Sequence, residues 1–342
     1  MGITVVMLFL LVAMGSSLRS RGDAEAALSR EQTQAVKGAF VVTVFFSHFC
    51  SYVSFVQWFD KPLPAYCTWL GQLMVVPFLF YSGYGVFESA KKKGAAYVKS
   101  FPRKRILKTL LHFDMAVLLF LAFDAFFAPG RLSLPVVLRS LVAWDSLGNS
   151  EWFVFAILCA YLFCWTGLAV FRSDRFRALL AVTALCVLYI AFVSRFKEHW
   201  WWDTILAFPL GCAVSLWKSS LSLLEKPLAW GTCCVLACVA LVSVKRGWIP
   251  DAHGQSALVA LLALIVFLSM RFALKGKILS WFGEQVFGIY ILQRLPMEFG
   301  KFFHWNESHF FLYFLFCLAS TLLLAAAFGK ATRFVDSRLF ES

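Results

Sequence analysis

The sequence has few charged residues and none of the short motifs that mark the common soluble enzymes. Charged side chains make up 15% of the 342 residues, whereas hydrophobic side chains make up 61%. There is no Walker phosphate loop, no Rossmann glycine pattern, no H-E-x-x-H and no G-x-S-x-G. A mean hydropathy of +0.75 implies more apolar surface than one soluble core could bury, so the composition predicts a membrane protein.

The cysteines lack the spacing of a metal site or of a disulfide framework. The ten cysteines lie mainly in apolar runs, and none forms a C-x-x-C pair. Cys233, Cys234 and Cys238 are close in the chain, but that apolar segment has no histidine or carboxylate nearby. We interpret them as small buried hydrophobic residues and predict no metal site.

Long apolar runs recur along the chain at the length of membrane-spanning helices. A span needs roughly 20 apolar residues at ~1.5 Å of rise per residue. Continuous runs favour helices over the alternating strands of a barrel. The predicted fold is therefore all-α, a polytopic membrane helix bundle of about ten transmembrane helices. The runs are residues 38–57, 69–87, 109–128, 152–171, 178–194, 203–218, 228–244, 256–272, 281–300 and 310–328.

A further apolar run at residues 3–16 precedes this body. Arg19 and Arg21 follow it and no basic residue precedes it, which is the wrong flank pattern for a cleaved signal. We interpret the run as an extra N-terminal hydrophobic helix that spans or anchors. The expected organisation is residues 1–29 as hydrophobic extension and polar linker, residues 30–330 as one membrane domain, and residues 331–342 as a cytoplasmic tail.

The net charge of +13 follows an alternating pattern. With residue 37 placed inside, most Lys and Arg residues fall in the connections that would lie inside, above all residues 88–108. The positive-inside rule then predicts a multi-pass protein of the cytoplasmic membrane with both ends of the ten-helix body cytoplasmic. Topology and contact with membrane lipids account for the basic character, so we expect no nucleic-acid partner.

His48 interrupts an otherwise apolar run, KGAFVVTVFFSHFC at residues 37–50. A polar residue in a span faces the bundle interior by default and is a functional candidate, the alternative being a histidine that only hydrogen-bonds a neighbouring helix. Lys37 and His48 are eleven residues apart, which places them on one helix face with ~16 Å of rise between them. A cation at the inner interface and a base deeper in the bundle suit a long substrate with an anionic head, such as acyl-CoA.

Several segments resemble acyltransferase family 3, the integral membrane O-acyltransferases that act as O-acetyltransferases of cell-surface glycans. The resemblance covers roughly residues 30–330, and its motifs occur in the order expected of the family. They are Lys37-Gly38 with Ser47-His48, PFLFYSGYGVFES with Ser82-Gly83-Tyr84, FPRKRILKTLLHF with Arg105 and Lys108, EWFVFAILCAYLF, FPLGCAVSLWK and FGEQVFGIYILQRLPM.

Two positions depart from the family pattern. Lys37 stands where the family usually has arginine, so a point charge replaces a bidentate fork. Gln293 stands where the I-Y-L-x-H pattern usually ends in histidine. This chain either does without that histidine or uses Arg294 instead.

The resemblance implies transfer of an acyl group, expected to be acetyl, from cytosolic acyl-CoA to a hydroxyl of a cell-surface glycan or its lipid-linked precursor. Acyl-CoA would be a co-substrate, with no tightly bound cofactor. The rival hypothesis is a glycan exporter or flippase of the same membrane fold. A transporter tends to show pseudo-repeated, Gly/Pro-broken spans, and the sequence has no such pair.

Acyl transfer to a hydroxyl needs a base near neutrality and donors for the developing oxyanion. We assign the base to His48, with Asp60 or Glu151 as the orienting carboxylate. For acyl-CoA we expect Lys37, Arg105 and Lys108 to bind phosphates, with Ser82 nearby. A Ser-Gly pair in a span is, however, also a close-packing device.

The acceptor side is predicted from aromatic and polar residues of later segments. The aromatic run beside His199 could stack a sugar ring, although it is also typical of an interface belt. His112 is interpreted as structural or as lying on the CoA side. The acceptor candidates are Trp152, His199, Trp201, Tyr290 and Gln293.

Overall fold

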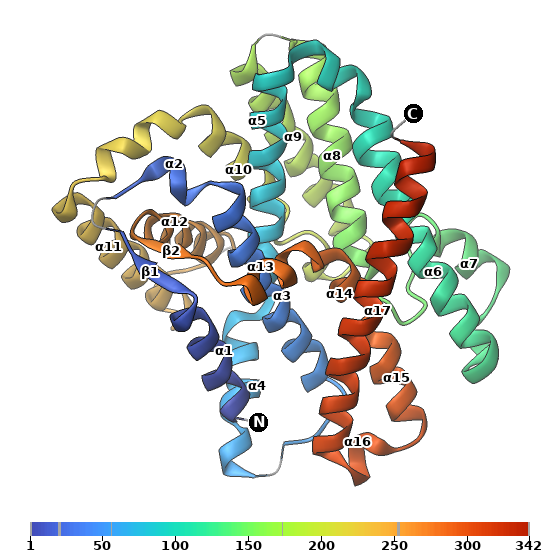
Figure 1. Ribbon diagram of the computed structural model, residues 1–342. Helices are drawn as coiled ribbons and strands as arrows, with labels where there is room; N and C mark the ends of the chain where they lie inside the picture. Colours follow the sequence, from blue (N-terminus) through green and yellow to red (C-terminus); the bar gives the residue numbers. More distant parts are fainter. Residues whose placement is uncertain (1, 20–21, 56, 173, 252–253, 341–342) are drawn as a thin grey trace.

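The computed structural model describes residues 2–19, 22–55, 57–172, 174–251 and 254–340 (Figure 1). It is helical almost throughout, which confirms the predicted all-α class. The longer helices are α3 (Arg30–Cys50), α5 (Val76–Phe101), α6 (Lys108–Phe127), α8 (Glu151–Phe171), α9 (Arg175–Val193), α11 (Pro227–Lys245), α12 (Gln255–Arg271) and α17 (Phe310–Leu339).

Short helices connect or extend these long ones. The α-helices are α1 (Gly2–Met14), α2 (Ala24–Ala27), α4 (Pro62–Leu70), α7 (Leu134–Ser140), α10 (Ala207–Leu216), α13 (Lys277–Glu284), α14 (Val286–Leu292), α15 (Arg294–Phe302) and α16 (Trp305–Ser308). The tighter turns are the 3-10 helices η1 (Trp58–Asp60), η2 (Gly71–Val75), η4 (Pro129–Arg131), η5 (His199–Trp201) and η6 (Lys218–Leu224). A π-helix, η3 (Pro102–Leu107), joins α5 to α6.

A two-stranded antiparallel sheet ties the N-terminal extension to the body. Strand β1 (Ser16–Leu18) pairs with β2 (Phe272–Leu274), which follows α12. At the other end of the extension, the Phe9 ring of α1 contacts Tyr66 of α4, with centroids 6.0 Å apart. Figure 1 accordingly shows the N-terminus beside α4 and the C-terminus at the opposite end of the molecule. The extension is therefore packed against the body.

Five helical stretches of the described chain are long and apolar enough to cross a membrane, and α10 with η6, bent by 81°, is a sixth candidate. Each of the ten predicted runs contains helix, but ten crossings stay a prediction. The run 281–300 is divided among α13, α14 and α15, with breaks at Gln285 and Gln293. The run 203–218 contains one short helix, α10.

Helix α3 begins and ends earlier than the predicted run 38–57. Ser29 caps its start by accepting a hydrogen bond from the Gln32 amide at 3.3 Å, as N-cap serines do. At its end, the Ser51 hydroxyl donates to the His48 carbonyl at 2.7 Å. His48 consequently lies in the last turn of α3.

Glycines of two sequence motifs mark helix crossings. A Cβ atom on Gly38 would lie 1.9 Å from the Leu279 carbonyl oxygen of α13. One on Gly83 would lie 2.1 Å from the Phe208 carbonyl oxygen of α10. Backbones approach this closely only where a side chain is missing. Gly38 therefore fixes α3 against α13, and Gly83 fixes α5 against α10.

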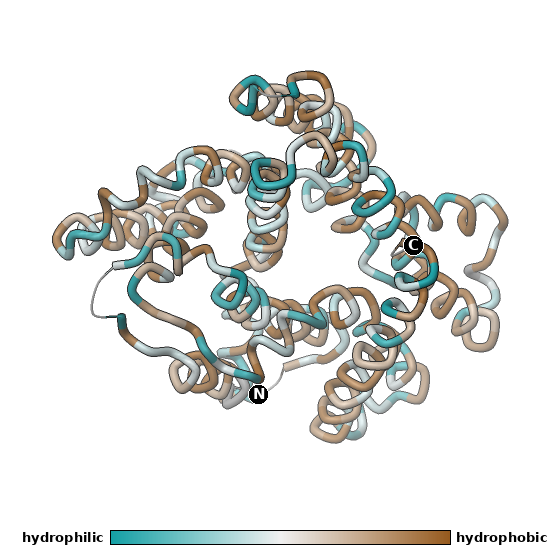
Figure 2. Tube along the Cα trace, turned by 45° about the horizontal axis from the view of Figure 1, so that its top comes forward, coloured by the Kyte–Doolittle hydropathy of each residue, from teal (hydrophilic) through white to brown (hydrophobic). Residues whose placement is uncertain are grey.

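The peripheral helices expose large apolar side chains. Phe126, Leu228 and Leu323 are 83%, 83% and 72% exposed. In Figure 2 brown dominates most helices, whereas teal is confined to short stretches, chiefly near turns. Such an apolar exterior suits lipid, and the chain is a membrane protein as its composition predicted.

Candidate active site

Three helices meet around His48. Its ring faces that of Tyr290 in α14, with centroids 6.2 Å apart. The Tyr290 ring in turn lies 5.2 Å from the Phe153 ring of α8. His48 is half-buried. The break that separates α14 from α15 places Tyr290 and the residues after it next to the end of α3.

Arg294, the first residue of α15, is the charge at the centre of this cluster. Its guanidinium lies within electrostatic range of His48, Glu151 and Tyr290. The residue is half-buried. The sequence indicated Arg294 only as a substitute for the family histidine. The signal that could have ranked it higher is an arginine that follows the apolar segment VFGIYIL after a single glutamine, Gln293.

Several buried polar atoms of this cluster have no hydrogen-bond partner among the described residues. Native proteins satisfy most such atoms, so an unsatisfied group requires an explanation. A substrate that brings donors and acceptors into the cluster would supply the missing partners. The atoms are His48 Nδ1, Gln293 Oε1 and Arg294 Nε, whereas the hydroxyls of Ser150 and Tyr290 lie close to each other.

Glu151 is the carboxylate that the structure brings to Arg294. It begins α8 and is 8% exposed. Among the described residues, the Glu151 carboxylate forms no salt bridge. Trp152, the next residue, is half-buried and contacts Phe153 with ring centroids 5.9 Å apart. Asp60, the other predicted carboxylate, lies on η1 beyond the end of α3.

Gln293 sits at the α14–α15 break and is fully buried. Its Nε2 donates to the Tyr290 carbonyl oxygen at 3.0 Å. The amide thus holds the end of α14, next to the tyrosine that faces His48.

Three basic side chains, those of Arg30, Lys37 and Arg105, lie together near the start of α3. The Lys37 ammonium lies within electrostatic range of Arg30 and Arg105. The Arg105 guanidinium lies beside the hydroxyls of Tyr97 in α5 and Tyr161 in α8. None of the three cations forms an ion pair with a carboxylate in the described part of the chain. Like charges collected without a counter-charge favour binding of an anion.

Lys108 and Ser82 have structural partners. Lys108 Nζ pairs with Asp336 Oδ2 of α17 at 2.6 Å, and His112 Nε2 lies 2.9 Å from Asp336 Oδ1. This carboxylate therefore joins two side chains of α6 to α17. Ser82 is half-buried on α5 beside the Gly83 crossing, which supports the close-packing interpretation of that pair.

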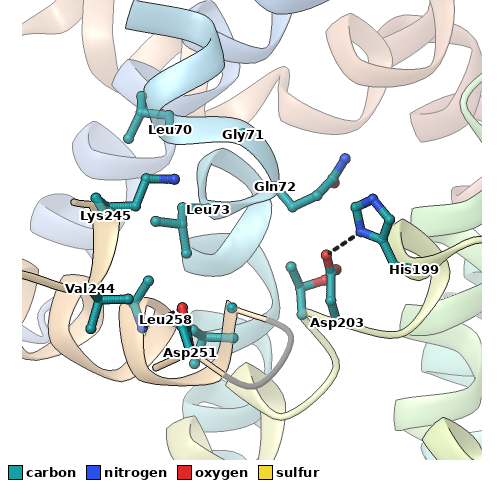
Figure 3. Close-up of a pocket in the computed structure, with 13 residues that line it drawn as sticks. Leu70, Gly71, Gln72, Leu73, His199, Asp203, Val244, Lys245, Asp251 and Leu258 are labelled. Carbon is teal, nitrogen blue, oxygen red and sulfur yellow. Dashed lines mark hydrogen bonds and ion pairs between the residues drawn. The ribbon is translucent and has the colours of Figure 1, made fainter. Parts of the chain in front are cut away.

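A polar pocket of about 400 Å³, whose lining does not include His48, lies near the end of α11 (Figure 3). His199 lies on its wall with Nδ1 3.2 Å from Asp203 Oδ2, and Gln72 points into the same space. Lys245 and Asp251 line it from the α11–α12 side.

Trp201 lies away from this pocket's lining. It is 6% exposed, and the Lys197 ammonium is 4.3 Å from its ring centroid. Its ring also contacts Trp144 and Phe155. Both sides of the indole are thus occupied by protein, which leaves His199 and Trp200 as the accessible members of that aromatic run.

A family model described as an acyltransferase domain matches residues 33–330. The chain belongs to acyltransferase family 3. The match includes every residue of the His48 cluster and, of the three cations, Lys37 and Arg105. No curated protein and no solved structure matched the chain. Membership in acyltransferase family 3 confirms the resemblance read from the motifs and supports transferase activity.

Proposed function

We propose that this member of acyltransferase family 3 is an O-acyltransferase that moves an acyl group from acyl-CoA to a glycan hydroxyl. Acetyl is the expected group, and the acceptor is a cell-surface glycan or its lipid-linked precursor. The observation that carries the proposal is the set of unsatisfied buried polar atoms around His48 and Arg294. A base, a cation and a phenol meet there, as acyl transfer to a hydroxyl requires.

In the proposed reaction, neutral His48 accepts the acceptor hydroxyl proton while the hydroxyl oxygen attacks the thioester carbonyl carbon. The carbonyl oxygen gains negative charge, which the Arg294 guanidinium and the Tyr290 hydroxyl stabilise. The tetrahedral intermediate then collapses with cleavage of the carbon–sulfur bond. The CoA thiolate leaves and takes the proton from His48, so the products are the ester and CoA. Glu151 acts as the counter-charge that holds Arg294.

The donor enters from the cationic side of α3. Lys37, Arg30 and Arg105 would bind its phosphates. The face of α3 from Lys37 to His48, which we call the His48 stripe, is long enough to accommodate the extended pantetheine arm. Because the connections on this side carry most of the Lys and Arg residues, we assign this side to the cytosol and the protein to the cytoplasmic membrane. Lys108 is assigned to the tie with Asp336.

The acceptor approaches from the opposite side, past the pocket that contains His199. Lys197 supports this route because it lies within electrostatic range of Glu151 and two residues before His199. Trp152, Tyr290 and Gln293 would contact the acceptor near the reacting hydroxyl.

The test uses membrane vesicles from cells that express the chain. Acetyl-CoA labelled in the acetyl group is added, and label is measured in the polysaccharide and lipid-linked sugar fractions. Label should enter a sugar fraction with the wild type and with His309→Ala, an exposed histidine that precedes α17. His48→Ala should abolish it. Glycan that crosses the membrane without acetyl-CoA, and without label, would instead identify an exporter.

A further inference from the structure

A groove of about 690 Å³ lies between the last turns of α5, the end of α8 and the start of α9. Lys99, Trp165, Arg172 and Arg175 supply its charged and aromatic lining, and the rest is apolar. We call it the α5–α8 groove. Figure 1 shows the end of α5 and the α8–α9 connection at the same end of the molecule as the C-terminus.

Two unusual backbone conformations shape this groove. Gly94 has φ 58° and ψ −141°, which breaks α5 at the point where the groove begins. Arg172, which ends α8, has φ 38°, a value that side-chain-bearing residues seldom adopt. Strained residues persist where the surrounding structure enforces them, and they concentrate at binding sites.

The groove offers two cations that the protein does not neutralise. Lys99 and Arg172 are exposed, and within the described residues neither forms an ion pair with a carboxylate. Arg175 is already engaged, because its guanidinium donates to the carbonyl oxygens of Arg172 at 2.8 Å and Ala90 at 3.0 Å. Arg175 therefore builds the wall, while Lys99 and Arg172 are available to a ligand.

The α5–α8 groove continues the surface on which the three cations gather. Tyr161 and Trp165 are four residues apart on α8, so they lie on one face of that helix. Because the Arg105 guanidinium lies beside Tyr97 and Tyr161, a ligand can extend from the groove past Arg105 to Lys37 and the His48 stripe.

We propose that the α5–α8 groove binds the adenosine 3′,5′-bisphosphate end of acyl-CoA, an inference that rests on the proposed function. Trp165 stacks on the adenine ring, and Lys99 and Arg172 bind the phosphates. The pantetheine arm then runs past Arg105 toward His48. An anionic lipid headgroup shares the phosphate chemistry, but it has no aromatic base to occupy the face of Trp165.

The first measurement is calorimetric titration of the purified full-length protein with adenosine 3′,5′-bisphosphate, which needs no acyl transfer. Arg172→Gln and Trp165→Leu should each weaken binding about tenfold, the effect of one lost charge-assisted or stacking contact. The matched control is Lys92→Gln, an exposed lysine of the same segment outside the groove, which should bind like the wild type. Unchanged affinity in the two groove variants would overturn the proposal.

The second measurement compares acetyl-CoA with S-acetyl-pantetheine, which lacks the nucleotide. The groove variants should lose about tenfold in kcat/KM with acetyl-CoA and keep the wild-type value with S-acetyl-pantetheine. Equal losses with both donors would show a general defect and contradict the inference. Transfer from neither donor by the wild type would refute the proposed function, and the titration would still decide the groove.

A third measurement tests whether the groove binds the phosphate of an anionic lipid headgroup instead of the nucleotide. The protein is reconstituted in vesicles of phosphatidylcholine with and without phosphatidylglycerol. Nucleotide affinity should be nearly independent of the anionic lipid. If phosphatidylglycerol displaces the nucleotide from the wild type but has no effect on Arg172→Gln, the groove is a lipid site and the nucleotide assignment is wrong.

Discussion

At the scale of single residues, the proposed chemistry depends on polar atoms that the protein buries without pairing them. His48, Gln293 and Arg294 each contribute such an atom. An apolar site with a few unsatisfied groups strengthens every hydrogen bond that a substrate makes there, because water does not compete. Three predictions at this scale concern proton transfer to His48, stabilisation of the oxyanion by Arg294 and binding of the donor phosphates.

The transfer rate is expected to fall as the solution becomes more acidic. Neutral imidazole accepts the hydroxyl proton and imidazolium does not, so protonation of His48 removes the base. Arg294 and Tyr290 are the charged and titratable groups that face it, and Glu151 lies near Arg294. The measurement is kcat for transfer from acetyl-CoA from about pH 8 down to the lowest pH at which the protein stays folded, because burial and the nearby Arg294 charge oppose protonation of His48. His48→Gln should leave a low residual rate without this acid limb, and a flat wild-type profile would contradict the assignment of the base.

Loss of the Arg294 charge should affect chemistry more than binding. We expect Arg294→Gln to lower kcat by about 10²–10³ with little change in KM for acetyl-CoA, because the charge acts on the developing oxyanion. Arg294→Lys should recover part of the rate. Arg246→Gln, an exposed arginine away from the cluster, is the control. A raised KM with unchanged kcat would place Arg294 in donor binding instead.

The cations on α3 and η3 should behave in the opposite way. Lys37→Ala and Arg105→Ala are expected to raise KM for acetyl-CoA and to spare kcat, because they bind the non-reacting end of the donor. Lys37→Arg should preserve or improve affinity, since guanidinium binds phosphate bidentately. Steady-state kinetics at varied acetyl-CoA tests this, and an unchanged KM in both alanine variants would assign these charges to membrane topology alone.

At the scale of elements, the working parts are joined by a few specific ties. The Gly38 crossing sets α13 against α3, and the break at Gln293 then directs Tyr290 and Arg294 toward His48. On the far side of α6, Asp336 joins Lys108 and His112 to α17. The Gly38 crossing thus positions the elements around His48, and the Asp336 contacts hold α6 against α17.

Removal of the Asp336 carboxylate should destabilise the bundle without altering donor affinity. We expect Asp336→Ala to cost about 1–3 kcal/mol, the penalty of leaving buried partners unsatisfied, seen as a lower Tm in detergent. Lys108→Met should likewise leave KM for acetyl-CoA unchanged in the folded protein. In a double-mutant cycle the two changes should not be additive, because they remove one interaction. A raised KM in Lys108→Met would return Lys108 to the donor site.

At the scale of the whole molecule, the proposed reaction requires donor and acceptor to reach His48 from opposite sides. The cations around Lys37 and the α5–α8 groove define one side. The end of α3, α4 and the N-terminus define the other (Figure 1). The acyl group would cross the bilayer while CoA remains on the cationic side.

The sidedness predicts how introduced cysteines react with an impermeant thiol reagent in intact cells. Lys61 and Lys92 are both exposed and lie on the two sides. Lys61→Cys should be labelled from outside, and Lys92→Cys only after permeabilisation. The unmodified chain is the background control, in which the native Cys67 is 6% exposed and should react slowly. Labelling of position 92 in intact cells would invert the topology and separate the basic segment from cytosolic acyl-CoA.

Composition and motif order determined the class of this protein without any structure. The apolar runs predicted a helical membrane bundle because backbone groups in lipid must be satisfied within the segment. The ordered motifs around Lys37, His48 and Ser82 were enough to indicate acyltransferase family 3. These properties depend on local sequence, which is why they could be inferred from it.

The partners of His48 were decided only by the tertiary structure. Of Asp60 and Glu151, it is Glu151, roughly one hundred residues from His48, that lies near Arg294. Arg294 itself reaches the site because α14 and α15 break at Gln293. Lys108 follows Arg105 closely in the sequence, but its ammonium pairs with Asp336 near the C-terminus. Such pairings depend on helix breaks and close crossings between distant segments, and these long-range contacts cannot be read from spacing along one helix.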